Sequence, residues 1–240
     1  MGDETHLVSN AASFAQRGYI IIENAVDLAE LHSLRAESDE LFNQAEADVV
    51  ADLGCILEPH SQLSNAERTS FELYTCARTE ATTTAEDVWR ITQRFATIAR
   101  SLLPSDVSVH LFNEQYIVKP PHQAQSTAFA WHRDSDFMDA HGRDMPTVAF
   151  WLALDDVKET NGTIFVSTSS AEQSAPPAAS IIGVPVVARA GTLVVIDGKL
   201  LHRSAPNNSD KFRRVYMPQF SGVVRRVDGE LVALAVPMEK

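Results

Sequence analysis

The second half of this chain is a succession of short β-forming runs that leave no room for helices between them. The runs are rich in β-branched and aromatic residues, and turn-forming text such as KPPHQAQS, DDVKETNG and SAPNNSDK separates them. The expected strands span about 107–118, 128–136, 147–155, 162–168, 181–188, 191–197 and 212–221. Many short strands without intervening helices are typical of a sandwich or barrel, and the double-sheet jelly roll, or double-stranded β-helix, fits best.

The first half favours helices that pack on an outer face of this β core. A D-x-x-E capping box at 27–30 precedes leucines at helical spacing. A second amphipathic helix is expected over about 84–103, with Thr84 and Asp87 as its cap. Residues 47–82 give no clear element, and we interpret them as loops.

The chain is long enough for one domain with a sizeable core, since it has 240 residues. We therefore expect a single domain over 1–240, helical in about 1–105 and jelly-roll in about 106–225. Within the helical part, Tyr19–Ile22 is rich in β-formers and predicts a strand.

Two distant segments together carry a metal-ligand set. His132 and Asp134 lie in FAWHRDSDF, and His202 lies seventy residues further along in GKLLHRSAPNN. Residues i and i+2 of a strand share a face, so His132 and Asp134 are expected to grip one ion from one strand while Arg133 faces away. Two imidazoles and one carboxylate leave three coordination positions open, which suits non-haem Fe(II) oxygenases better than a closed structural zinc site. Arg213 follows the distal histidine by eleven residues, and its planar fork suits a bound dicarboxylate.

These motifs have an order that resembles the phytanoyl-CoA dioxygenase family of Fe(II)- and 2-oxoglutarate-dependent oxygenases. The order is HxD, an NG pair before a β-run, a distal H-x-S-x-x-N, and arginine eleven residues after the distal histidine. The resemblance runs from about residue 14 to about residue 221. The matching stretches are RGYIIIENAVDLAEL, YIVKPP, WHRD, FWLALDDVKETNGTIFV, GTLVVIDGKLLHRSAPNNS and FRRVYMPQF. One departure is Ser167–Ser170, where the family usually has a Pro-Gly-Ser-His-like turn.

The resemblance implies roles for individual residues. His132, Asp134 and His202 would be the catalytic metal ligands, with Fe(II) as cofactor and 2-oxoglutarate and dioxygen as co-substrates. Ser204 and Arg213 would hold the far carboxylate of 2-oxoglutarate.

Four further side chains are placed by strand parity or by the resemblance. Gln115 would lie near the 2-oxoglutarate pocket, with a solvated surface amide as the alternative. Trp151 would line that pocket, fill the core, or both. Lys119 is interpreted as a turn lysine before two prolines, and Arg214 as a surface charge on the opposite strand face from Arg213.

The activity implied by the resemblance is oxidation of an unactivated C–H bond in a small organic substrate. Hydroxylation is the expected outcome, with release of succinate and CO2. Two alternatives stay open, namely a non-catalytic jelly-roll binding module and a cupin-like metal dioxygenase that does not use 2-oxoglutarate. Such a centre needs water kept away, so the irregular stretches 47–82 and Ser167–Ser180 are expected to line the substrate entrance.

The composition limits the classes of molecule that the protein is expected to bind. The net charge of −12 argues against nucleic acid and against an anionic membrane surface, and leaves a small molecule as the expected partner. Neither a signal peptide nor an apolar run long enough for a membrane span is evident. Cys55 and Cys76 have no metal-binding spacing, so a reducing compartment, the cytoplasm, is expected. The sequence leaves the oligomeric state open.

Overall fold

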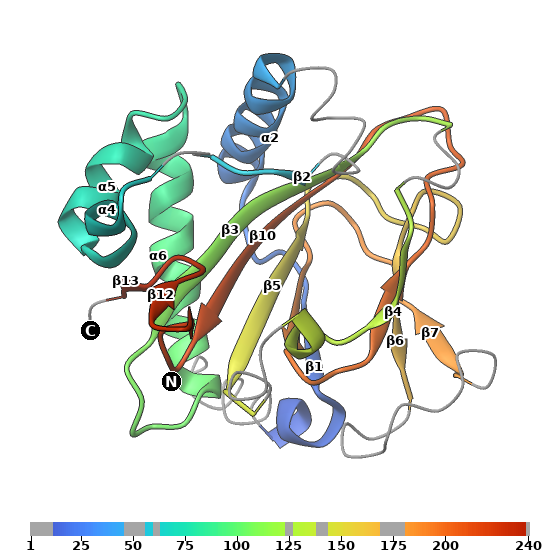
Figure 1. Ribbon diagram of the computed structural model, residues 1–240. Coiled ribbons are helices and arrows are strands. Elements are labelled where there is room, and N and C mark those ends of the chain that lie inside the picture. The colour runs from blue at the N-terminus through green and yellow to red at the C-terminus, as the bar shows by residue number, and fades with distance from the viewer. Residues whose placement is uncertain are drawn as a thin grey trace, which may run out of the picture.

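The protein has three layers in a computed structural model: helices, a large antiparallel sheet and a small antiparallel sheet (Figure 1). The structure describes residues 12–45, 56–59, 63–122, 127–137, 144–168 and 181–238. The expected fold class, a jelly roll with flanking helices, is confirmed.

The large sheet has seven strands, and β2 pairs with β3 beside the main path. Its strands, in order, are β1 (Tyr19–Ile22), β8 (Leu193–Asp197), β5 (Thr147–Ala153), β10 (Arg213–Ser221), β3 (His110–Lys119) and β13 (Val236–Pro237), with β2 at Ile56–Leu57. The small sheet contains β4 (Phe129–His132), β9 (His202–Ser204), β6 (Ile164–Ser167) and β7 (Gly183–Pro185). A separate hairpin joins β11 (Arg226–Val227) to β12 (Glu230–Leu231).

The large sheet is buried on both faces. In β5, Phe150 and Leu152 pack toward the helices, whereas Trp151 and Ala153 pack toward the small sheet. The same alternation holds in β8, β10 and the second half of β3. Because side chains alternate across a strand, the large sheet contributes to two cores, one against the helices and one against the small sheet. The candidate site lies on the side that faces the small sheet.

Four helices form the layer on the outer face of the large sheet (Figure 1). They are α2 (Leu28–Gln44), α4 (Asn65–Thr69), α5 (Phe71–Thr79) and α6 (Ala85–Leu102). The expected capping box of α2 is confirmed, because Asp27 accepts the Glu30 N–H at 2.8 Å and Glu30 accepts the Asp27 N–H at 3.0 Å. The expected cap of α6 is wrong, because Thr84 donates instead to the Ser33 carbonyl at 3.0 Å. None of the described helices combines the length and apolar composition that a membrane crossing requires.

The interpretation of 47–82 as loops is wrong over its second half, which forms α4 and α5. Ser64 begins α4 with a capping box to Glu67, and Ser70 caps α5. The α5 helix buries Tyr74 together with a charged residue, Arg78. A short helix that buries a charge has no apolar stripe to reveal it, because the groups that stabilise the charge lie elsewhere in the chain.

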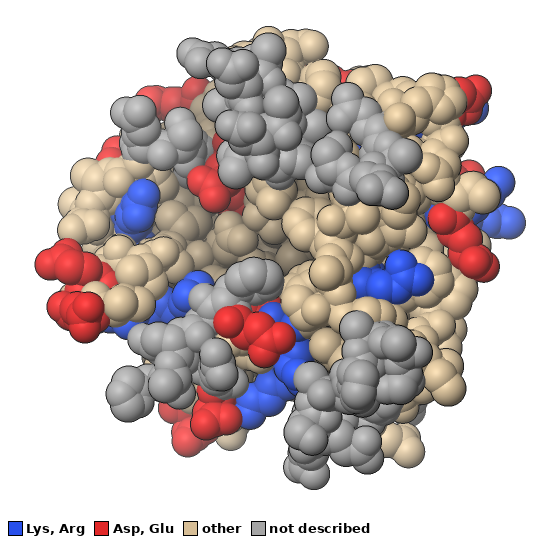
Figure 2. Space-filling view, turned by 45° about the vertical axis from the view of Figure 1, so that its right-hand side comes forward, with Lys and Arg blue, Asp and Glu red and all other residues tan. Residues whose placement is uncertain are grey.

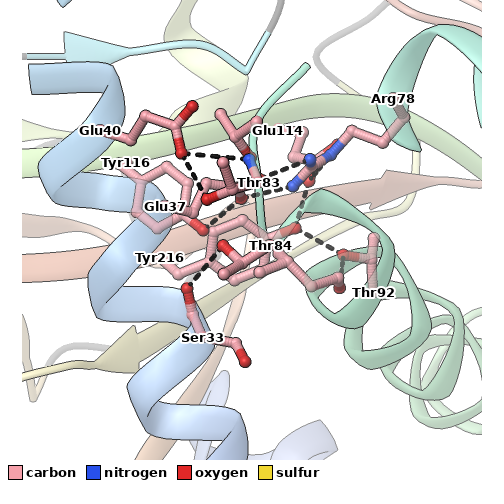
Figure 3. A network of polar contacts seen from close by, with 12 residues as sticks. Ser33, Glu37, Glu40, Arg78, Thr83, Thr84, Thr92, Glu114, Tyr116 and Tyr216 are labelled. Carbon is pink, nitrogen blue, oxygen red and sulfur yellow. Dashed lines mark hydrogen bonds and ion pairs between the residues drawn. The ribbon is translucent and has the colours of Figure 1, made fainter. Parts of the chain in front are cut away.

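Those groups form a buried polar network between the helices and the sheet (Figure 3). Arg78 donates two hydrogen bonds to Glu37 of α2, at 2.6 and 2.7 Å, and one to Glu114 of β3 at 2.9 Å. Each carboxylate also accepts from two hydroxyl groups. The hydroxyl donors are Tyr116 and Thr82 for Glu37, and Tyr74 and Tyr216 for Glu114. The network therefore ties two helices to the centre of the large sheet.

The other strand expectations agree with the structure, with two differences near the candidate site. The 128–136 run forms a strand only as far as His132, and Asp134 begins a 3-10 turn, η1 (Asp134–Phe137). The chain turns there because the Asp136 carboxylate accepts the Arg133 N–H at 2.9 Å. The large sheet also takes strands β1, β2 and β13 from outside the expected 106–225 range.

Candidate metal centre and cosubstrate pocket

Pairing of β4 with β9 brings the two candidate histidines together. His132 and His202 are direct partners in the register of this antiparallel pair, and their ring centroids lie 4.3 Å apart. Asp134 completes the group, since one carboxylate oxygen lies 3.8 Å from Nε2 of His132 and 3.7 Å from Nε2 of His202. One ligand atom from each of the three residues lies within 4.8 Å of the others.

Backbone carbonyls fix the orientation and tautomer of both imidazole rings. Nδ1 of His132 lies 2.8 Å from the Ala130 carbonyl, and Nδ1 of His202 lies 3.0 Å from the Leu200 carbonyl. A carbonyl only accepts, so each Nδ1 carries the proton and each Nε2 presents its lone pair. Burial, followed by the neighbouring His202, lowers the pKa of His132 and so favours the neutral ring that a metal needs. The donor set therefore fits a divalent metal with open positions.

The candidate carboxylate ligand is itself oriented by a side chain of the large sheet. Gln219 of β10 donates from Nε2 to Asp134 at 2.9 Å. Asn113 of β3 donates to the amide oxygen of Gln219 at 2.8 Å, which sets the direction of that amide. The sequence predicts that strand parity orients Asp134. In the structure the 3-10 turn and the two hydrogen bonds from Asn113 through Gln219 orient it instead.

A buried pair of cations lies in the same region. Arg213 and Lys119 are direct partners in the β10–β3 register, and both side chains are almost fully buried. Lys119 donates to Ser204 Oγ at 2.7 Å and to the Ala205 carbonyl at 2.5 Å. Nε of Arg213 has no hydrogen-bond partner among the described residues. Among those residues, no carboxylate lies within 4.0 Å of either cation.

Burial lowers the pKa of both Lys119 and Arg213. Burial and the nearby Arg213 lower the pKa of Lys119 to about 6, and burial lowers the pKa of Arg213 to about 9. Like charges directly opposite each other in a sheet are destabilising. An anion bound between them would relieve this repulsion and accept the unused Arg213 N–H, so the pair has the character of a carboxylate site.

Two motif residues keep this cation pair in place. Gly162 of the NG pair has φ +93° and packs so tightly that a Cβ there would lie 2.8 Å from Cδ of Lys119 and 3.5 Å from Nε of Arg213. Asn207 of the H-x-S-x-x-N motif donates to the Lys119 carbonyl at 2.8 Å and to the Lys211 carbonyl at 2.7 Å. The motif thus positions the ends of β3 and β10, where the cations lie.

The metal group, Ser204 and Arg213 line one cavity of about 560 Å³ between the two sheets, and Lys119 reaches this cavity through its hydrogen bond to Ser204. Gln115 and Trp151 both line it, and Trp151 is only 2% exposed, so Trp151 is a core residue that also faces the cavity. Figure 2 shows one face of the molecule with a hollow near its middle and both basic and acidic groups at the rim. The volume is in the ordinary range for a small-molecule site.

The expected parity of the last strand agrees with the structure. Arg213 lines the cavity, whereas Arg214 turns to the outer face and pairs with Asp155 at 2.8 Å and Asp39 at 2.7 Å. Arg133 also turns away from the metal group, with its Nε 3.1 Å from the Lys199 carbonyl.

The expected entrance stretches are described only in part. From the first stretch, Ile56, Glu58, Leu63 and Arg68 line the cavity, although much of that stretch is helical. From the second, residues 169–180 lie outside the described residues.

Sequence reasoning missed two functional candidates, Lys119 and Gln219. The interpretation of Lys119 as a turn lysine is wrong, because its side chain is fully buried. A signal was present, since the strand pattern puts Lys119 on the same face as Gln115. Gln219 carried no local signal, because its partner Asp134 is distant in the sequence and lies in the η1 turn that follows β4.

Comparison with known proteins identifies the family. The profile of the phytanoyl-CoA dioxygenase family matches residues 14–215. The chain belongs to the phytanoyl-CoA dioxygenase family. A curated relative, the mouse (Mus musculus) phytanoyl-CoA dioxygenase domain-containing protein 1, is 28% identical over 124 residues, which are 42% of this chain and 41% of that protein. The match thus spans less than half of that relative's length.

Solved structures share the fold at low identity. The epimerase SnoN, in complex with Fe3+, α-ketoglutarate and nogalamycin RO, has a TM-score of 0.66 at 16% identity, covering 99% of this chain and 97% of its own. AviO1 from Streptomyces viridochromogenes Tue57 has a TM-score of 0.66 at 18% identity, with coverages of 92% and 96%. EctD from S. alaskensis, with 2-oxoglutarate and 5-hydroxyectoine, has a TM-score of 0.64 at 20% identity, with coverages of 92% and 77%.

Proposed function

We propose that this protein is an Fe(II)- and 2-oxoglutarate-dependent dioxygenase. It oxidises an unactivated C–H bond of a small organic substrate, with hydroxylation as the outcome and with release of succinate and CO2. The observation that carries the proposal is the presence, in one cavity, of the His132, Asp134 and His202 group beside the buried Arg213 and Lys119 pair.

In this proposal each polar residue has a stated task. His132, Asp134 and His202 hold Fe(II) through Nε2, a carboxylate oxygen and Nε2, and the bound metal supplies the activation of dioxygen. Arg213, with Ser204 and Lys119, binds the far carboxylate of 2-oxoglutarate through charge-assisted hydrogen bonds.

The walls of the cavity complete the cosubstrate site. Trp151 and Ile196 of the large sheet and Ile164 of the small sheet are buried apolar residues that line it. They exclude water from the reacting atoms and strengthen the ionic contacts. Gln115 lies on the same strand face as Lys119 and supplies an amide beside the cosubstrate.

A turnover assay tests this function. Purified protein with Fe(II) and 2-oxoglutarate is expected to form succinate, and a screen of metabolites is expected to find one that stimulates it. Asp134→Ala is expected to abolish succinate formation while retaining the fold, because the jelly roll is built by other contacts. Metal binding without any succinate would favour the binding module, and oxidation of a substrate without succinate would favour the cupin-like dioxygenase.

We also propose that the chain acts as one domain in the cytoplasm. The helical layer shares its core with the large sheet, which supports a single folding unit. Cys76 is exposed and free, which suits a reducing compartment. Limited proteolysis that released a stable helical fragment would contradict the single domain.

A further inference from the structure

The cavity has a second charged end, formed by elements that lie far from the metal group. Figure 1 shows α4 and β12 on one side of the molecule and β4 and β6 on the other. The cavity is lined by residues from both sides. Leu63 and Arg68 come from the α4 region, and Arg225 and Leu234 come from the segments that flank the β11–β12 hairpin.

Three of the charged residues in the cavity lining already have a task. Asp134 belongs to the metal group, and Arg213 belongs to the cosubstrate site. Glu114 belongs to the buried network behind the cavity, where it accepts from Arg78 at 2.9 Å and from two tyrosine hydroxyls.

Among the described residues, the remaining charged residues of the lining are Arg68, Arg225 and Glu58. Glu58 is exposed, whereas both arginines are partly buried. In a chain of net charge −12, two guanidinium groups therefore lie at one end of the cavity. A guanidinium group attracts an anion and repels a cation.

Arg68 is the group best prepared for a ligand. Among the described residues, its buried Nε has no hydrogen-bond partner and no carboxylate lies within 4.0 Å of its guanidinium, although the charge of Arg68 acts on the Glu58 carboxylate at longer range. Its backbone is held in place, because its carbonyl accepts the Ala235 N–H at 2.7 Å. A buried donor without a partner is costly unless a ligand satisfies it.

The rest of the cavity lining is mainly apolar. Its apolar side chains include Ile56, Leu63, Phe112, Met217, Val232 and Leu234. A ligand that matches both features has an apolar body and one anionic group at its far end. Guanidinium binds a carboxylate through two parallel hydrogen bonds, so a carboxylate is the group that fits best.

We propose that this enzyme acts on an amphipathic organic carboxylate, whose carboxylate is bound by Arg68 while its apolar body extends toward the metal group. The proposal rests on the proposed function for the reaction, but binding at Arg68 does not require turnover.

The test compares carboxylic acids with their uncharged primary amides. The probes are matched pairs, 4-phenylbutanoic acid with 4-phenylbutanamide, cyclohexylbutanoic acid with its amide, and 2-naphthylacetic acid with its amide. Binding is measured by calorimetry on the full chain loaded with Mn(II) and saturated with 2-oxoglutarate. The variants are Arg68→Gln and, as a matched control, Arg90→Gln, an exposed arginine of α6 outside the cavity lining.

We expect the acids to bind the unaltered protein and Arg90→Gln roughly tenfold to a hundredfold more tightly than their amides. In Arg68→Gln this preference is expected to disappear, while the affinity for 2-oxoglutarate stays unchanged. Arg68→Lys, which keeps the charge but loses the fork, is expected to be intermediate, and it replaces Arg68→Gln if that variant does not fold.

Three results would overturn the proposal: no acid binds, the amides bind as tightly as the acids, or Arg68→Gln keeps the preference. Acid binding that is lost in Arg213→Gln but kept in Arg68→Gln would also overturn it, because the probes would then occupy the cosubstrate site. Failure of the proposed function is a separate result. In that case the protein does not bind 2-oxoglutarate, and the acid preference is measured with Mn(II) alone.

Discussion

Replacing Arg78 by methionine removes the only cation from the buried network that joins the helices to the sheet, as far as the described residues show. The side chain is fully buried and donates three hydrogen bonds, two to Glu37 and one to Glu114. Both carboxylates are also buried, at 0% and 3% exposure, and each keeps two hydroxyl donors in the variant. The variant therefore leaves two carboxylates in the interior with hydrogen bonds but without a counter-charge.

Breaking a buried ion pair by removing one partner costs about 3–5 kcal/mol. In a domain of this size each kcal/mol lowers Tm by about 2–4 °C, so Arg78→Met is expected to lower Tm by roughly 6–20 °C. The assay is thermal unfolding followed by circular dichroism. Arg90→Met is the control, because Arg90 makes its ion pairs on the exposed surface of α6, and its Tm is expected to stay close to that of the unaltered protein.

The pH dependence separates lost charge from lost packing. In Arg78→Met the stranded carboxyls have a raised pKa in the folded state, so the folded state binds more protons than the unfolded state, and stability falls as the pH rises. The Tm difference from the unaltered protein is therefore expected to widen from about pH 4.3 upward. Adding Glu37→Gln and Glu114→Gln removes both stranded charges and is expected to recover most of the loss. A Tm within about 2 °C of the unaltered protein in Arg78→Met would refute the reasoning.

Three further predictions concern the site. Gln219→Leu is expected to weaken Mn(II) binding about 10- to 100-fold by calorimetry, because Asp134 loses its orienting donor, and an unchanged affinity would show that the turn alone suffices. Burial and Arg213 lower the pKa of Lys119 to about 6, so 2-oxoglutarate is expected to bind with proton uptake at pH 7.5 and more weakly as the pH rises. Calorimetry in buffers of different ionisation enthalpy measures this uptake, and Lys119→Met should abolish it. Arg213→Gln is expected to cost about 2–5 kcal/mol of 2-oxoglutarate affinity, whereas Arg214→Gln should change it little, and equal effects would contradict the strand register.

Local pattern predicted most of the sheet because strands and turns are encoded over a few neighbouring residues. The runs that became β5 and β8 are apolar and β-branched, whereas β3 and β10 mix apolar and polar residues, and both faces of each strand are largely buried. The parity of β10 correctly separated Arg213 from Arg214. Parity was less reliable where the backbone leaves regular structure, as at Asp134, since a 3-10 turn does not follow the period of two.

The helical layer was harder to predict because its stabilising contacts are long-range. The α5 helix buries Arg78 against Glu37 and Glu114, which come from α2 and β3. A charged residue in a sequence suggests an exposed face unless its partners are known. The same reason explains why 47–82 was interpreted as loops.

The sequence by itself determined the strand succession, the three candidate metal ligands and the arginine eleven residues after the distal histidine, because each depends on residue type and spacing. Only the tertiary structure decided that Lys119 is buried beside Arg213, that Gln219 orients Asp134, and that Arg68 lines the cavity with an Nε that no described residue accepts from. The physical reason is that the energy of a charged or polar group depends on what surrounds it. Those surroundings come from strands and helices distant in the chain, which come together only on folding.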